Sequence, residues 1–133
     1  MDLLADDVSA ETVRDILASD YENIEIDEDG FIIIHKDEMH FIIGLDDERK
    51  YIRFASCWQK GDSISENRAT RVMNTWNKKK VFTTAYFNDD SFWLEFYMTY
   101  KGGLNSANLL ETLEWFIVGA NQFGPMLDDE DAI

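Results

Sequence analysis

Two pairs of β-rich runs, each joined by a turn only two or three residues long, constrain the fold of this chain most strongly. Residues 31–36 and 39–45 flank the turn Asp37-Glu38, and residues 81–87 and 91–100 flank the turn Asn88-Asp89-Asp90. Turns this short join neighbouring antiparallel strands. We therefore predict two hairpins, and an antiparallel sheet built mainly from them.

Helical periodicity appears on both sides of these hairpins. Ser9 can cap a helix over residues 10–19, which places Val13, Ile16 and Leu17 on one apolar stripe. The other predicted elements are strands over residues 21–26 and 51–58, a helix ending at Lys78-Lys79-Lys80, and a last helix stopped by Gly124-Pro125. The order α-β-β-β-β-α-β-β-α predicts an α+β fold with helices packed on one face of an antiparallel sheet.

The chain is long enough for one hydrophobic core, and its 133 residues contain no segment that reads as a linker. We predict a single domain over residues 9–126, preceded by a short tail over residues 1–8. Residues 127–133 are mostly acidic and have little apolar content to offset the entropy of ordering them. We therefore expect them to form a solvated acidic tail.

The charge balance excludes several kinds of partner. Twelve Lys and Arg against 27 Asp and Glu give a net charge of −15, which repels phosphate backbones and anionic lipid. The N-terminus is acidic where a signal peptide needs basic residues, and no apolar run approaches the ~20 residues of a membrane helix. With Cys57 as the only cysteine, we predict a cytoplasmic protein that binds neither nucleic acid nor membrane.

No motif for catalysis or cofactor binding stands out, so we predict a binding or regulatory protein, with no catalytic residue and no cofactor. One group of metal-ligating residues remains. The Asp37-Glu38 turn places His35 opposite His40, and Cys57 follows on the next strand in a register that the sequence leaves open. Two imidazoles and a thiolate could hold zinc, but no fourth ligand is identifiable, and we predict no bound metal.

The two faces of the predicted strand over residues 91–100 differ in an unusual way. Phe92 and Leu94 begin an apolar core face, whereas the opposite face carries Trp93 and Tyr97 on either side of Glu95. The strand over residues 51–58 adds Tyr51 and Arg53 to such a second face. Either a helix or the tail covers this face, or it contacts a partner. We predict a partner or homodimer surface at Tyr51, Arg53, Trp93 and Tyr97.

The second helix carries the main basic feature of this acidic chain. Arg68, Arg71 and Lys78 lie on its outer face, followed by Lys79 and Lys80. These cations could dock an acidic segment of a partner. The ordinary interpretation, which we prefer from the sequence alone, is a solvated face with cations placed favourably at a helix C-terminus.

The same helix resembles a known family. The segment Val72-Met73-Asn74-Thr75-Trp76-Asn77-Lys78 is similar to the V-N-x-W-N helix of the YbjN family of bacterial sensory transduction regulators. Further similar segments, which extend the resemblance over roughly residues 9–123, are Val13-Arg14-Asp15-Ile16-Leu17, Tyr21, Ile26-Asp27-Glu28-Asp29-Gly30, Ala85-Tyr86-Phe87, Gly102-Gly103-Leu104, Asn108-Leu109 and Trp115. Asp20 departs from the glycine that the family more often has before the aromatic residue.

The resemblance implies a fold similar to type III secretion chaperones, often dimeric, and no established catalytic residues. It favours a non-enzymatic regulatory or adaptor protein that acts through protein–protein contacts. One alternative is a secretion-type chaperone that binds an extended client protein. The other alternative is a small-molecule or metal sensor that uses His35, His40 and Cys57.

Overall fold

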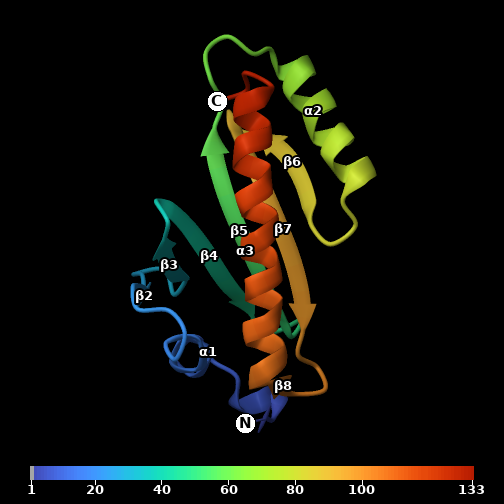
Figure 1. The fold of residues 1–133 in the computed structure, drawn as a ribbon. Helices are drawn as coiled ribbons and strands as arrows, with labels where there is room; N and C mark the ends of the chain where they lie inside the picture. Colours follow the sequence, from blue (N-terminus) through green and yellow to red (C-terminus); the bar gives the residue numbers. More distant parts are fainter. Residues whose placement is uncertain (1) are drawn as a thin grey trace. The chain divides into compact units, whose positions relative to one another are not determined.

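The computed structural model describes residues 2–133 (Figure 1). In chain order the elements are β1 (Asp2–Leu3), the 3₁₀ helix η1 (Ala5–Asp7), α1 (Ala10–Leu17), β2 (Ile24–Ile26), β3 (Ile32–Lys36), β4 (Met39–Asp46), β5 (Tyr51–Gln59), α2 (Glu66–Lys79), β6 (Thr84–Asn88), β7 (Ser91–Thr99), β8 (Leu104–Asn105) and α3 (Ser106–Asp129). Six strands form an antiparallel sheet in the order β2-β3-β4-β5-β7-β6. The predicted α+β class is confirmed.

Contacts between residues divide the chain into two compact units. The first contains the described residues up to Phe54 together with Tyr97–Trp115, and the second contains Ala55–Phe96 and Phe116–Ile133. By these bounds β5, β7 and α3 contribute residues to both units. The single domain over residues 9–126 stays a prediction.

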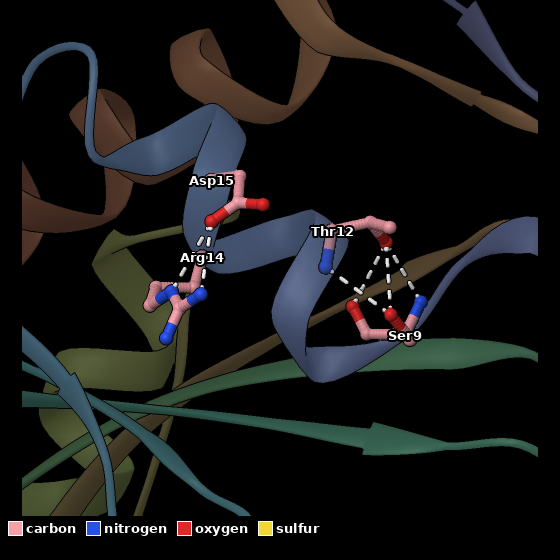
Figure 2. Close-up of polar contacts among 4 residues, drawn as sticks. All are labelled: Ser9, Thr12, Arg14 and Asp15. Carbon is pink, nitrogen blue, oxygen red and sulfur yellow. Dashed lines mark hydrogen bonds and ion pairs between the residues drawn. The ribbon is translucent and has the colours of Figure 1, made fainter.

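In the first unit, α1 begins as its sequence predicts (Figure 2). The backbone N–H of Thr12 donates to Ser9 Oγ at 3.1 Å, and the backbone N–H of Ser9 donates to Thr12 Oγ1 at 2.8 Å. This reciprocal pair satisfies two donors that the first turn would otherwise leave unpaired. The helix then buries the predicted stripe of Val13, Ile16 and Leu17.

The first hairpin also has the predicted register. β3 pairs with β4 so that His35 faces His40 across the two-residue turn. Asp37 and Glu38 have φ angles of 52° and 64°, the left-handed pair that a two-residue hairpin turn favours. The side chains that point into the core from these strands are fully buried: Ile32, Ile34, Phe41 and Ile43.

The N-terminal segment differs from the tail predicted over residues 1–8, of which Met1 lies outside the described residues. β1 pairs antiparallel with β8, and the Asn105 amide donates to Asp2 Oδ1 at 2.7 Å. Gly103 makes this approach feasible, because a Cβ on it would lie 2.8 Å from the carbonyl oxygen of Leu3. Val8 is buried as well. Strands of two residues are too short to produce a readable alternation.

In the second unit, three aromatic rings from different elements pack together. Phe123 of α3 makes edge-to-face contacts with Trp58 of β5 and with Trp76 of α2, at centroid distances of 5.0 and 4.9 Å. The hairpin of β6 and β7 has the register Asn88↔Ser91, so its loop is Asp89-Asp90.

The C-terminus differs most from the sequence prediction. α3 does not stop at Gly124-Pro125 but continues to Asp129, with Pro125 inside the helix. Leu127 and Ala132 are both fully buried, and the carbonyl oxygen of Ala132 accepts a 2.7 Å hydrogen bond from the backbone N–H of Gly61. The segment 127–133 is therefore not a solvated tail. Its apolar side chains Leu127 and Ala132 are buried in the second unit, while its acidic side chains are exposed.

Candidate functional site

α2 is held in the second unit by polar contacts as well as by packing. Ser65 caps it, with its hydroxyl accepting from the backbone N–H of Arg68. The Trp76 indole N–H donates to Thr83 Oγ1 at 3.1 Å, and the Asn77 amide both donates to and accepts from the backbone of Ala85 at 2.8 Å. Trp76 is buried, and Asn77 ties helix to strand. These two residues of the family motif therefore have structural roles.

Beside these anchors, α2 and the C-terminal part of α3 form the two walls of a groove of about 550 Å³. The basic groove, as we call it, is lined by Arg68, Arg71, Val72, Thr75, Trp76, Lys79, Lys80, Gln122, Met126 and Glu130. All of these residues belong to the second unit. Its volume is in the range of ligand-binding clefts.

Two of the four cations in the basic groove already have partners. Arg68 Nη2 lies 3.1 Å from Glu130 Oε2, and Lys80 Nζ lies 3.0 Å from Gln122 Oε1. The Lys80 ammonium also lies 5.4 Å from the centroid of the Trp76 ring, within cation–π range. Within residues 2–133, the side chains of Arg71 and Lys79 make no hydrogen bond or ion pair. They are the two cations available to a ligand.

The charge of the basic groove is opposite to that of the chain. It contains four of the twelve Lys and Arg residues and only one carboxylate, Glu130, although the chain carries a net charge of −15. A local excess of cations attracts anionic groups at contact distance. Lys78, the other cation of the predicted basic face, is exposed and does not line the groove.

The sequence identified one wall of the basic groove and missed the other. Arg68, Arg71, Lys79 and Lys80 were expected on the surface of the second helix. Gln122 and Met126 of α3 and Glu130, one residue beyond its end, stand at four-residue spacing, and the backbone N–H of Glu130 still donates to Met126 O in the helical pattern. The expected helix end at Gly124 hid this spacing, because it left Met126 and Glu130 outside the helix.

The four residues predicted for a partner or dimer surface lie in different units. In the first unit, the Tyr51 and Tyr97 rings meet edge to face at 5.1 Å, Arg53 is half-buried, and Tyr97 is 46% exposed. In the second unit, Trp93 is half-buried and stacks on Tyr86 at a centroid distance of 6.3 Å. Their role as a contact surface stays a prediction.

The histidine pair forms as predicted, with ring centroids 4.4 Å apart. His35 Nε2 also lies 3.3 Å from Glu25 Oε1. Cys57 is exposed. Among residues 2–133, no group of three or more His, Cys, Asp and Glu side chains is placed to hold a metal ion.

None of the helices within residues 2–133 combines the length and the apolar character needed to cross a membrane.

Comparison with known proteins gives both a family and a set of similar folds. The family model YbjN, described as "Putative bacterial sensory transduction regulator", matches residues 9–129. No curated protein matches the chain in sequence. The crystal structure of YbjN from E. coli is similar with a TM-score of 0.68 and 15% identity, over 92% of this chain and 96% of that one.

Two further solved structures contain protein partners. The ExsC–ExsE complex is similar with a TM-score of 0.63 and 17% identity, over 84% of this chain and 90% of that one. The Yersinia pestis type III secretion chaperone SycH, in complex with a stable fragment of YscM2, is similar with a TM-score of 0.58 and 14% identity, over 86% of this chain and 98% of that one. At these identities the likeness establishes the fold, which resembles that of type III secretion chaperones.

Proposed function

The chain belongs to the YbjN family, and from this premise we propose that it is a non-enzymatic regulator or adaptor that acts by binding another protein. The observation that carries the proposal is the basic groove, where Arg71 and Lys79 present unpaired cations on an acidic chain. Such a groove favours association with an anionic surface. We also propose a cytoplasmic homodimer, with Tyr51, Arg53 and Tyr97 of the first unit and Trp93 of the second as contact residues.

The lining of the groove supports binding over catalysis. It contains no histidine or cysteine to act as base or nucleophile, and its one carboxylate, Glu130, is paired with Arg68. Thr75 donates its hydroxyl proton to the backbone carbonyl of Arg71 and not to a side-chain base. The chemistry that these side chains offer is charge pairing and apolar contact.

A second candidate function is that of a secretion-type chaperone. It is favoured by two of the solved structures of similar fold, which are complexes of a chaperone with a fragment of another protein or with an effector. A client held in extended form would add to an exposed sheet edge or follow an aromatic strand face. β2 and β6 are the edge strands of the six-stranded sheet.

Capture from a bacterial lysate with a cross-linker tests the proposal, provided that the partner is then purified and the complex reconstituted. An unrelated acidic protein of similar net charge is the control, because any acidic surface retains basic proteins unspecifically. We expect a complex of defined stoichiometry. A folded signalling protein as partner supports the regulator, and a secreted, partly unfolded protein supports the chaperone. The proposal fails if no retained protein forms a defined complex.

A further inference from the structure

We propose that the occupant of the basic groove is an extended acidic segment of the protein partner, with an apolar side chain between two carboxylates. The inference rests on the proposed function and adds the chemistry of the partner. Glu130 of the chain itself already places a carboxylate 3.1 Å from Arg68, so the groove is suited to this group.

The spacing of the cations selects a segment over a compact anion. Arg68, Arg71, Thr75 and Lys79 follow one line along α2, with intervals of three, four and four residues. At a rise of about 1.5 Å per residue, Arg71 and Lys79 begin about 12 Å apart along the axis. Carboxylates four residues apart in an extended chain are separated by about 13 Å. Two carboxylates of one extended segment match this separation, whereas a single phosphate group requires the Arg71 and Lys79 side chains to converge on it.

The part of the groove between these cations is apolar. Val72 and Trp76 of α2 are buried, and Met126 of α3 is half-buried opposite them. A segment with carboxylates at both ends would therefore place a middle side chain against apolar atoms and an adaptable thioether. This arrangement favours an acidic sequence that is interrupted by Leu or Phe over a purely acidic one.

Fluorescence anisotropy with a labelled peptide of about ten residues that repeats Glu-Thr-Leu-Thr tests this inference, because in an extended chain its carboxylates stand four residues apart with a Leu midway on the same side. The measurement should be made at physiological salt, where a Debye length of about 8 Å limits the repulsion between the acidic peptide and the other acidic residues of the chain. We expect saturable binding that weakens at least tenfold in the Arg71→Glu/Lys79→Glu variant. The control variant Lys78→Glu/Lys101→Glu makes the same change of net charge at exposed residues outside the groove and should bind like the wild type.

A variant that should bind the peptide more tightly than the wild type gives a second test. Glu130→Gln removes the carboxylate that competes for Arg68, and we expect the peptide to bind this variant a few-fold more tightly. A peptide with Ser in place of each Leu should bind at least tenfold more weakly than the original. Unchanged circular dichroism establishes that each variant is folded.

Several results would overturn the inference: no saturable binding of the peptide, equal loss in the control variant, full competition by inorganic phosphate, or equal binding of the peptide with Ser. So would light scattering that finds a dimer which Arg71→Glu/Lys79→Glu separates, since the groove would then join two copies. The proposed function is tested separately. If the reconstituted partner still binds Arg71→Glu/Lys79→Glu, the inference is wrong and the adaptor function stands.

Discussion

Six non-glycine residues among residues 2–133 have positive φ angles, and each lies in a turn or at a helix end: Asp37, Glu38, Lys50, Asp89, Asp90 and Asp131. An L-residue in this conformation places its Cβ close to the backbone, which costs free energy that glycine does not incur. In Asp37-Glu38 and Asp89-Asp90 the two adjacent positive angles match the twist of the hairpin strands. Each of these residues therefore lowers the free energy of unfolding relative to a glycine at the same position.

Glu38→Gly should therefore stabilise the protein. At a φ of 64° the substitution relieves the Cβ contact, and we expect a gain of about 1 kcal/mol in the free energy of unfolding. Thermal unfolding followed by circular dichroism should show a rise of about 3–5 °C in Tm. Glu28→Gly is the matched control, because it removes the same charge at a residue without a positive φ and should lower Tm slightly. A lower Tm for both variants would contradict the argument.

Asp46 should make the stability depend on acid pH. The backbone N–H of Arg49 donates to its carboxylate at 2.8 Å, and this bond is the main cause that holds the pKa of Asp46 below its usual value. A lowered folded pKa means that the contribution of Asp46 is present above the unfolded pKa of about 3.9 and is lost as the pH falls through the folded pKa.

The comparison of Asp46→Asn with the wild type tests this at several pH values. The wild type should be more stable from pH 7 to 5 by a constant margin, measured as the urea midpoint. The margin should shrink below about pH 4, where the carboxylates become protonated. A margin that stays constant to pH 2 would show that the ionised form of Asp46 contributes nothing.

Among the helices, α3 depends most on its C-terminal turn. The backbone N–H of Ala132 donates to Leu127 O and that of Asp131 donates to Asp128 O, with Asp131 at a φ of 55°. This is the Schellman arrangement, and the buried pair of Leu127 and Ala132 supplies the apolar contact that accompanies it. A helix that contains Pro125 thus ends in a cap whose backbone groups are hydrogen-bonded.

Deletion of residues 128–133 should destabilise the protein. It removes this cap, the 2.7 Å bond from Gly61 to Ala132 and the ion pair of Arg68 with Glu130. We expect a loss of about 2–3 kcal/mol in the free energy of unfolding, since a cap and a buried hydrogen bond contribute about 1 kcal/mol each. The variant Asp128→Asn/Asp129→Asn removes two charges without shortening the chain and should leave Tm almost unchanged. An unchanged Tm for the deletion would mean that the segment is solvated, as the sequence suggested.

These elements also show which parts of the fold could be predicted from the sequence. Hairpins with short turns, amphipathic stripes and polar caps were predictable, because each depends on residues that are neighbours in the chain. The continuation of α3 past Pro125 was not predictable, because a proline inside a helix costs about 3 kcal/mol and only tertiary burial offsets it. The basic groove has α2 as one wall and the C-terminal part of α3 as the other. Because the sequence did not predict the helix beyond Gly124, it could not predict the groove either.

For the molecule as a whole, the proposed homodimer has to overcome the repulsion between two chains that each carry a net charge of −15. Like charges repel, so the contact must come from apolar area. Burial of one large side chain contributes about 1.5–3 kcal/mol, and a few such side chains can hold a dimer together. On β7, Tyr97 in the first unit is exposed and Trp93 in the second is half-buried. The basic groove is not required for this contact.

We therefore expect light scattering to give the mass of a dimer, and the dimer should tighten as salt screens the repulsion. Trp93→Asp and Tyr97→Asp should each give a folded monomer with unchanged circular dichroism, because an aspartate on the contact would be buried without a partner. Arg71→Glu/Lys79→Glu is the control and should remain a dimer. A wild type that stays monomeric at high concentration would contradict the prediction. If Trp93→Asp fails to fold, Trp93 belongs to the core through its stacking on Tyr86, and Tyr97→Asp then decides whether the aromatic face forms the dimer.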